Sequence, residues 1–299
     1  MTSDRRADPT EHLPNSYVSR RSTEAQALFA WAPPAGVLGA LTDEAVARAA
    51  TLRSSLAELQ RDADAAPIQP SFATALRRAD VAVIAEVKRS SPSKGAINPD
   101  LDLVRQVRAY ESAGAAAISV LTEPTRFGGS NDDLTTARKS VRLPLLKKDF
   151  HVDVLQILEA RALGASAALV IARAVAPKRV QDLMKAGADY GLEILLEVHS
   201  EKELELALSL DASLIGVNNR NLETLAIDRE TSFRLLPLIP RDVVAIAESG
   251  IRSAADVKSF AEAGADAVLV GSELSGSRDP EAGVRVLIGI KRTGGARKS

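Results

Sequence analysis

The sequence contains no cysteine and only three histidines among its 299 residues. Without cysteine the chain forms no disulfide, has no thiolate nucleophile and cannot ligate zinc or an iron–sulfur cluster through sulfur. The histidines, His12, His151 and His199, are scattered; near the strand ends there is no third histidine and no Asp partner at a fixed spacing. We therefore interpret His151 and His199 as ordinary residues at strand ends and expect no metal site.

Long apolar runs and an excess of one charge are also missing. No run approaches the roughly 18 residues of a membrane span, and the first residues lack the apolar core of a signal peptide. Thirty-eight basic residues against 39 acidic ones give a net charge of −1, so no strong field attracts nucleic acid or an anionic membrane. We expect a cytoplasmic protein with neither kind of partner.

The composition divides the chain into four segments. Residues 1–35 mix both charges with Pro, Ser and Thr and show no apolar period, which predicts a disordered tail. Its acidic residues argue against the alternative, a transit peptide. Residues 36–80 are predicted to form a helical extension packed on the main domain, residues 81–292 that domain, and residues 293–299 a C-terminal tail. Within the extension we expect a helix from Thr42 to Asp62 whose buried face is formed by Val46, Ala49, Ala50, Leu52, Leu56 and Leu59.

Between Val81 and Ile290, eight short apolar runs alternate with eight amphipathic segments. The runs are VAVIAEV, AAAISVL, PLLKKDF, ASAALVIA, EILLEVH, LIGVNN, VVAIAES and ADAVLVG. Runs this apolar are typical of parallel strands covered on both faces. A motif of the form Gly-Ala-x-Ala directly after Ala113, Leu163 and Ala263, with a weaker copy at Asp211, gives a repeat near 50 residues. A repeat of that length holds two βα units, and eight units of about 25 residues predict a (β/α)8 TIM barrel. A doubly wound sheet uses the same units and is the alternative.

Charged residues follow the predicted strands at the end where barrel enzymes keep their active sites. Because alternate residues of a strand face the barrel interior, Glu86 and Lys88 share a face of the first strand, as do Lys148 and Phe150 on the third. The later strands add further polar residues at the same end, namely Glu197, Asn218, Arg220 and Glu248. Each of them alone is explained by an ion pair at the barrel rim. Partly buried charges are costly unless paired, so six charged residues and one asparagine at one mouth indicate a functional site.

Small residues after the last two strands predict a phosphate site. Ser249 and Gly250 follow the seventh strand, and Gly271 and Ser272 follow the eighth. The common phosphate site of these barrels is formed by those two loops, where small residues let backbone N–H groups reach the oxygens. A basic, hydroxyl-rich loop, Lys88-Arg-Ser-Ser-Pro-Ser-Lys-Gly95, is interpreted either as a solvated turn or as a lid over an anionic substrate.

These motifs resemble those of the indole-3-glycerol phosphate synthase family, a (β/α)8 family of tryptophan biosynthesis. Ile84-Ala-Glu-Val-Lys-Arg-Ser-Ser-Pro-Ser-Lys-Gly95 is similar to the family's first-strand signature. Further similar motifs follow in the family's order: Phe127-Gly-Gly-Ser130, Lys148-Asp-Phe150, Leu196-Glu-Val-His199, Asn218-Asn-Arg-Asn-Leu222 and Ala247-Glu-Ser-Gly-Ile251. The similarity runs from about Gly36 to Lys291 and includes the helix before the barrel.

The resemblance implies a carboxy-lyase that closes the pyrrole ring of 1-(2-carboxyphenylamino)-1-deoxyribulose 5-phosphate without a cofactor. It implies that Lys148 is the general acid and Glu197 the general base, with Lys88, Glu86 and Asn218 also catalytic. The implied substrate-binding residues are Ser91, Phe150, Arg220, Leu222, Glu248, Ser249, Gly250, Leu269, Gly271 and Ser272. We expect a monomer acting on a phosphorylated small molecule, with association with other tryptophan-pathway enzymes left open.

The sequence departs from the family's pattern at two loops. Asn221 stands where the family usually has Asp, and Ser275-Gly-Ser follows Leu274 where the family usually continues Met-Arg. We expect these departures to alter loop contacts but to touch none of the strand-end charges. Two rival functions remain, a sugar-phosphate isomerase such as phosphoribosylanthranilate isomerase and a non-catalytic barrel. The isomerase uses a cysteine that this chain lacks, and the acid and base candidates argue against a non-catalytic barrel.

Overall fold

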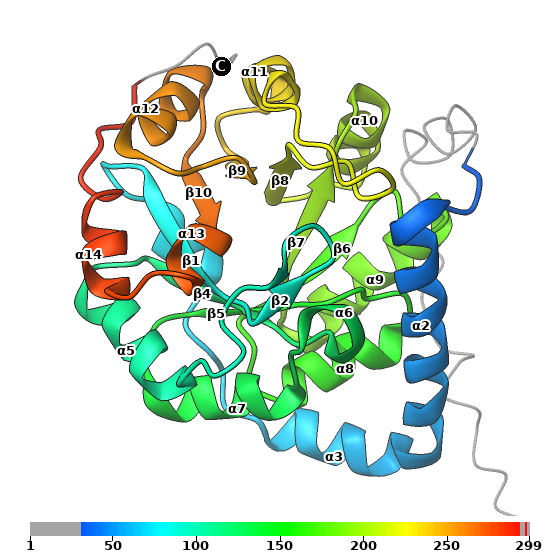
Figure 1. Cartoon of the computed structure of the whole chain (residues 1–299). Helices are drawn as coiled ribbons and strands as arrows, with labels where there is room; N and C mark the ends of the chain where they lie inside the picture. Colours follow the sequence, from blue (N-terminus) through cyan, green and yellow to red (C-terminus); the bar gives the residue numbers. More distant parts are fainter. Residues whose placement is uncertain (1–30, 294–296, 298–299) are drawn as a thin grey trace, which may run out of the picture.

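Eight parallel strands close into a barrel in the computed structural model, which describes residues 31–293 and residue 297 (Figure 1). The strands are β1 (Ala82–Val87), β4 (Ala117–Leu121), β5 (Leu145–Lys148), β6 (Ala167–Ile171), β7 (Glu193–Val198), β8 (Leu214–Asn218), β9 (Val244–Glu248) and β10 (Ala267–Val270). Each coincides with one of the eight apolar runs. The barrel closes where β1 pairs with β10, with Ala82 opposite Ala267. The predicted (β/α)8 barrel is confirmed, and the doubly wound alternative is wrong.

A helix follows each barrel strand and covers it from outside. These helices are α5 (Leu103–Ser112), α7 (Asn131–Ser140), α8 (Val154–Ala162), α9 (Pro177–Tyr190), α10 (Glu201–Ser209), α11 (Glu230–Leu235), α12 (Ala254–Ala263) and α14 (Pro280–Arg285). A short 3-10 turn, η2 (Leu236–Leu238), extends α11. Because the helices cover the outer surface and side chains fill the interior, almost every strand residue is buried.

The sequence repeat corresponds to the turn that leads from a helix into the next strand. Gly114, Gly164 and Gly264 stand in this turn with φ of +94°, +80° and +109°, a conformation that favours glycine. In the weaker copy Asp211 takes the same role with φ of +54°. Aspartate is among the few residues that adopt this conformation at modest cost, which explains why the fourth copy is harder to recognise.

Four short elements lie in the loops at the carboxyl ends of the strands. The hairpin of β2 (Ser90–Ser91) and β3 (Gly95–Ala96) follows β1, α6 (Pro124–Phe127) follows β4, and α13 (Ser272–Ser275) follows β10. Figure 1 shows these elements at the face of the barrel turned toward the viewer. They enclose the candidate site described below.

The N-terminal extension differs from its predicted helix. Two helices, α2 (Gly36–Leu52) and α3 (Leu56–Ala65), are separated by the 3-10 turn η1 (Arg53–Ser55), and α4 (Phe72–Leu76) precedes the barrel. Most of the predicted buried face is wrong, since Val46 is 55% and Leu56 46% exposed. Of the predicted residues only Ala49 is buried, and the other buried residues of α2 are Leu38, Leu41, Thr42 and Ala45. Figure 1 shows α2 running along one side of the barrel.

The predicted tails contain residues that contact the barrel. Trp31 donates its indole N–H to the carbonyl of Arg173, and Arg173 donates to the carbonyl of Ala32. Arg297, within the predicted C-terminal tail, is 7% exposed. Residues 1–30 of the predicted disordered tail lie outside the described residues. Within the described part of the chain, no helix is long and apolar enough to cross a membrane.

Candidate active site

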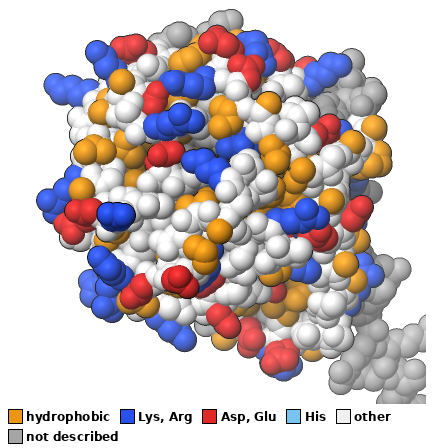
Figure 2. All heavy atoms as spheres, viewed as in Figure 1, with side chains coloured by type: hydrophobic (Ala, Val, Ile, Leu, Met, Phe, Trp, Pro, Cys, Tyr) orange, Lys and Arg blue, Asp and Glu red, His pale blue; other side chains and the backbone are white. Residues whose placement is uncertain are grey.

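All fifteen residues predicted for the site line one cavity at the carboxyl ends of the strands. They are Glu86, Lys88, Ser91, Lys148, Phe150, Glu197, Asn218, Arg220, Leu222, Glu248, Ser249, Gly250, Leu269, Gly271 and Ser272. On the face that Figure 2 shows, basic side chains gather in the upper part with hydrophobic ones beside them. The structure therefore brings together residues that are up to 186 positions apart in the sequence, between Glu86 and Ser272.

A mostly buried lysine between two glutamates lines the cavity. The Nζ of Lys148, at the end of β5, lies 3.0 Å from Glu197 Oε2 and 3.0 Å from Glu248 Oε2. Asn218 donates its Nδ2–H to the other oxygen of Glu197 at 3.0 Å. The two glutamates are almost fully buried, so their charges interact with the lysine more strongly than they would in water.

The protonation states of Lys148, Glu197 and Glu248 depend on one another. Burial opposes the charge of Lys148, but Glu197, Glu248 and Glu86 outweigh it and raise the pKa of the lysine above its usual range. Burial also opposes the charge of Glu197, yet Lys148, His199 and the bond from Asn218 lower its pKa. Burial and the repulsion of Glu197 raise the pKa of Glu248, although Lys148 counteracts them. The cluster therefore holds a charged lysine and a charged Glu197 at neutral pH, with Glu248 the carboxylate that accepts a proton first.

A second ion pair extends the cluster along β1. Lys88 Nζ lies 2.9 Å from Glu86 Oε1, and both side chains are buried or nearly so. Gly271 packs directly against this pair, because a Cβ at that position would lie 2.2 Å from Glu86 Oε1 and 2.9 Å from Lys88 Nζ. Any side chain at position 271 would therefore displace the pair.

Backbone groups and an arginine line a further part of the cavity. Ser249 and Gly250 have φ of +66° and +81°, which turns the backbone sharply after β9. Arg220 donates to the carbonyl of Leu225 at 2.9 Å, which fixes its guanidinium at the cavity wall. The amide groups of this turn, the start of α13 and the arginine together suit an anion such as phosphate.

Apolar side chains form the remaining wall, and the sequence had not indicated all of them. Phe127 and Phe150 lie with ring centroids 6.3 Å apart. Val37 and Leu41, both from α2, also line the cavity and were not predicted. The sequence indicates these two residues only weakly. Helix α2 begins at Gly36, six residues before the predicted helix, so Val37 and Leu41 precede the segment in which a buried face is expected.

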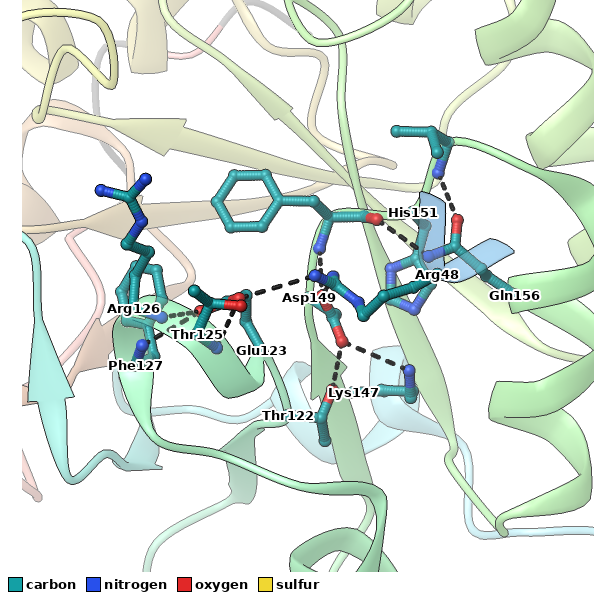
Figure 3. A network of polar contacts seen from close by, with 12 residues as sticks. Arg48, Thr122, Glu123, Thr125, Arg126, Phe127, Lys147, Asp149, His151 and Gln156 are labelled. Atoms are coloured by element: carbon teal, nitrogen blue, oxygen red, sulfur yellow. Dashed lines mark hydrogen bonds and ion pairs between the residues drawn. The ribbon is translucent and has the colours of Figure 1, made fainter. Parts of the chain in front are cut away.

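A polar network, in which Asp149 and Phe127 also line the cavity, joins α2 to the ends of β4 and β5 (Figure 3). Arg48 lies 2.7 Å from Asp149 and 3.5 Å from Glu123. Asp149 also accepts bonds from Thr122 and from the Phe150 amide. The carboxylate of Glu123 accepts hydrogen bonds from the backbone amides of Thr125, Arg126 and Phe127 in the first turn of α6. This network holds the segment that carries Lys148 and the turn that carries Phe127.

The histidines differ in their surroundings. His151 is buried behind β5 with Nδ1 2.6 Å from the Leu169 carbonyl. His199 lies with its ring nitrogens 3.4 Å from Glu197 and 3.4 Å from Glu203. Among the described residues no group of His, Cys, Asp and Glu has the arrangement of a metal site.

The structure is a closed (β/α)8 barrel with a cluster of lysine and carboxylates at the carboxyl ends of its strands. These features define the class of protein, a barrel enzyme with an acid–base site. Comparison with known proteins narrows this class, because residues 40–287 match the model of the family "Indole-3-glycerol phosphate synthase". An indole-3-glycerol phosphate synthase from Mycolicibacterium gilvum is 48% identical over 234 residues, 78% of this chain and 86% of its own length. Indole-3-glycerol phosphate synthase 2 from Streptomyces coelicolor is 45% identical over 256 residues, 85% and 99% of the two chains. The chain belongs to the indole-3-glycerol phosphate synthase family, the carboxy-lyases of tryptophan biosynthesis.

Solved structures with low sequence identity share the fold alone. A 3-hexulose-6-phosphate synthase from Salmonella typhimurium gives a TM-score of 0.54 at 14% identity, covering 69% of this chain and 96% of its own. A thiamine phosphate pyrophosphorylase from Pyrococcus furiosus gives 0.53 at 16% identity, with coverage of 69% and 93%.

Proposed function

We propose that Lys148 and Glu197 carry out the synthesis of indole-3-glycerol phosphate in this protein, as general acid and general base. The single observation that supports these roles is the position of Lys148 Nζ, 3.0 Å from both Glu197 and Glu248 in the wall of the cavity. The substrate is 1-(2-carboxyphenylamino)-1-deoxyribulose 5-phosphate, and carbon dioxide and water leave as the pyrrole ring closes.

The first step needs an acid. The ring carbon that bears the carboxylate attacks the ketone carbon, and the ketone oxygen becomes an alkoxide that must take up a proton. Lys148 remains protonated at neutral pH because three carboxylates surround it. A lysine whose pKa is raised is a weak acid, but a developing alkoxide is basic enough to take its proton. Loss of carbon dioxide then returns the electron pair of the broken carbon–carbon bond to the ring.

The last step needs a base. Lys148, once reprotonated from solvent, gives a second proton to the hydroxyl, which leaves as water. Glu197 takes the proton that the neighbouring carbon of the new ring loses, so that the pyrrole becomes aromatic, and returns it to Lys148. Glu197 is ionised, and Asn218 and Lys148 hold its two oxygens in place. Lys88 is positioned to neutralise the substrate carboxylate, and Glu86 orients Lys88 through their ion pair. Phe150 packs against the anthranilate ring.

Steady-state kinetics test these roles. A positioned acid or base contributes about 10²–10⁴-fold to the rate, so Lys148→Met and Glu197→Gln are each expected to lower kcat by that order. KM should change much less, because neither residue holds the phosphate. Lys88→Met should raise KM as well. Formation of indole-3-glycerol phosphate is followed by fluorescence, and circular dichroism checks folding. If Lys148→Met retained more than about a tenth of parental kcat, the acid role would pass to Lys88.

Phosphate binding is assigned to Arg220, Ser249, Gly250, Gly271 and Ser272. Gly250→Val places a β-branched residue at φ of +81°, which strains the turn and removes its amides from the phosphate. We expect KM to rise at least about tenfold, the loss of one charge-assisted hydrogen bond, with a smaller change in kcat. Inhibition by inorganic phosphate should weaken in parallel. Equal affinity of variant and parent for phosphate would place the phosphate elsewhere.

We also propose a monomer in the cytoplasm, with association with other enzymes of the pathway left open. A biosynthetic enzyme that consumes a phosphorylated intermediate acts where that intermediate is made, which supports the location. Light scattering of the purified chain tests the oligomeric state.

A further inference from the structure

The end of β1 that carries Glu86 and Lys88 extends beyond its partner strand. Ala82 donates its amide to the carbonyl of Asp266, so the backbone groups of even-numbered residues of β1 face β10. The pairing of β1 with β10 stops at Ala85 and Val270, because β10 ends there. The carbonyl of Glu86 and the amide of Lys88 therefore face a side where no strand supplies partners. Buried backbone groups of this kind need a substitute.

Ser275, the last residue of α13, supplies both partners from one hydroxyl. Its Oγ donates to the Glu86 carbonyl at 2.8 Å and accepts from the Lys88 amide at 3.0 Å. The side chain is completely buried and is not part of the cavity lining. A hydroxyl has one donor and two acceptor sites, so it can replace the N–H and C=O that a neighbouring strand would offer.

Further bonds hold Ser275 in this place. Tyr110 donates its hydroxyl to the same Glu86 carbonyl at 3.2 Å. Gln106 donates to the Leu274 carbonyl at 3.1 Å, and Asn98 donates to the Ser275 carbonyl at 3.1 Å. Helix α5, which carries Gln106 and Tyr110, and the loop after β3 thus fix the position of α13 against β1.

We infer that Ser275 is a positioning residue, which holds the side chains of Glu86 and Lys88 in their 2.9 Å pair through the backbone of β1. The inference rests on the roles proposed above for these two residues. Gly271 leaves no space beside the pair, so a small shift of the backbone changes where Lys88 meets the substrate. Ser275 stands where the sequence departs from the family's pattern. This departure leaves the charged groups themselves untouched, as expected, but Ser275 bonds the backbone of two residues that carry them, Glu86 and Lys88.

Substitutions that change only the hydroxyl test the inference. Ser275→Ala is expected to lower kcat about tenfold or more, since displacement of a reacting group by about 1 Å costs up to about 10²-fold. Ser275→Thr and Ser275→Val have the same shape and suffer the same crowding, so the threonine variant should be several-fold more active than the valine variant. Ser277→Ala removes an exposed hydroxyl two residues further on and should leave kcat unchanged.

A double-mutant cycle with Lys88→Met separates positioning from simple stabilisation. If Ser275 acts through Lys88, Ser275→Ala should cost little additional kcat/KM in the Lys88→Met background. Equal losses in both backgrounds, or a lower Tm with parental kcat, would overturn the inference. Parental kinetics for Lys88→Met would instead refute the role of Lys88 in the proposed function. The threonine–valine comparison would then still decide whether the hydroxyl acts on the site.

Discussion

At the scale of single residues, His151 is a neutral histidine enclosed between positive charges. It is 2% exposed, and its Nδ1–H donates to the carbonyl of Leu169. Burial, together with the charges of Lys147 and Arg48, lowers the pKa of His151 to about 3, although Asp149 opposes the shift. The ordinary value of 6.5 applies to the unfolded chain. Between about pH 3 and pH 6.5, His151 therefore binds a proton in the unfolded chain but not in the folded chain.

This shift predicts how stability depends on pH. The stability that His151 contributes is complete above about pH 6.5 and is lost progressively as the pH falls toward 3. At pH 5 the loss is about 2 kcal/mol, since each pH unit costs about 1.4 kcal/mol. His151→Gln, which cannot titrate, should therefore lose about 2 kcal/mol less than the parent between pH 7.5 and pH 5 in urea unfolding.

His199 offers a control of opposite sign. Burial opposes its charge, but the hydrogen bond to Glu203 and the charge of Glu197 raise its pKa. The stability that it contributes is present below its unfolded pKa and is lost as the pH rises through the folded value. His199→Gln should therefore lose more stability than the parent on acidification. The same pH response in both variants would contradict at least one of the two assignments, and a response equal to the parent's would contradict both.

The charged residues at the strand ends of the candidate site could be predicted because period-2 alternation decides which side chains enter a barrel, whereas Ser91, Leu222 and Leu269 rested on the family resemblance alone. Lys148 faces the cavity, whereas Lys147 points to the outside of β5. The sequence could not show that Lys147 is 1% exposed, since that depends on Glu159 of α8 and on Asp149, which lie 3.1 Å and 3.6 Å from its Nζ. Nor could it show how Asn221 replaces the family's aspartate. Its Oδ1 accepts the amides of Glu223 and Thr224 and closes a local turn.

At the scale of elements, strands were easier to predict than the N-terminal helices. A buried parallel strand is recognised by its own apolar run, whereas the buried face of a helix depends on what it packs against. Residues 36–65 are rich in alanine, so several faces look equally apolar, and the break at η1 has no glycine or proline to mark it. The elements α6 and α13 were not predicted, because helices of four residues are too short to show an apolar period. The contacts of α13 come moreover from residues distant in the sequence, as Ser275 shows.

Arg48 is the residue through which α2 supports the site. Arg48→Met would leave Asp149 and Glu123, 5% and 0% exposed, without their arginine. Arg48 is itself 29% exposed, so we expect a loss of about 2 kcal/mol, below the 3–5 kcal/mol of a fully buried pair. Because the network holds the segment of Lys148 and the turn of Phe127, kcat should fall about tenfold.

Arg53 on the following turn provides the matched control. Its guanidinium lies 3.7 Å from Asp153 and its side chain is 72% exposed, so Arg53→Met should change stability and kcat little. Urea unfolding and steady-state kinetics compare the two variants. If Arg48→Met lowered stability with parental kcat, α2 would stabilise the barrel without supporting the site.

At the scale of the whole molecule, the two ends of the barrel carry different buried charges. The carboxyl ends of the strands hold three buried or nearly buried carboxylates and two lysines around a cavity. At the amino-terminal ends, Asp266 precedes β10 and accepts the Ala245 amide at 2.8 Å. It also pairs with Arg292 and, at 2.6 Å, with Arg297. In this fold the first end serves chemistry and the second serves stability.

At the amino-terminal end of the barrel, Nε and both terminal nitrogens of the Arg297 guanidinium donate hydrogen bonds. Besides Asp266, its guanidinium bonds the carbonyls of Ile239, Pro240, Val243 and Gly264. Arg297→Ala would remove the arginine donors from these four carbonyls and from Oδ2 of Asp266. We expect a loss of about 3 kcal/mol, typical of a broken buried pair, and a fall in Tm of roughly 6–12 °C.

The kinetic constants of Arg297→Ala should remain parental at 25 °C, because Arg297 lies at the end of the barrel opposite the site. Arg285→Ala removes an exposed arginine that pairs within α14, and should change Tm by less than about 2 °C. Thermal unfolding and steady-state kinetics of both variants decide the matter. An unchanged Tm would show that Arg297 does not stabilise the barrel. A lower kcat in the folded variant would mean that a defect at the amino-terminal end reaches the cavity through β10, so the two ends would not be independent.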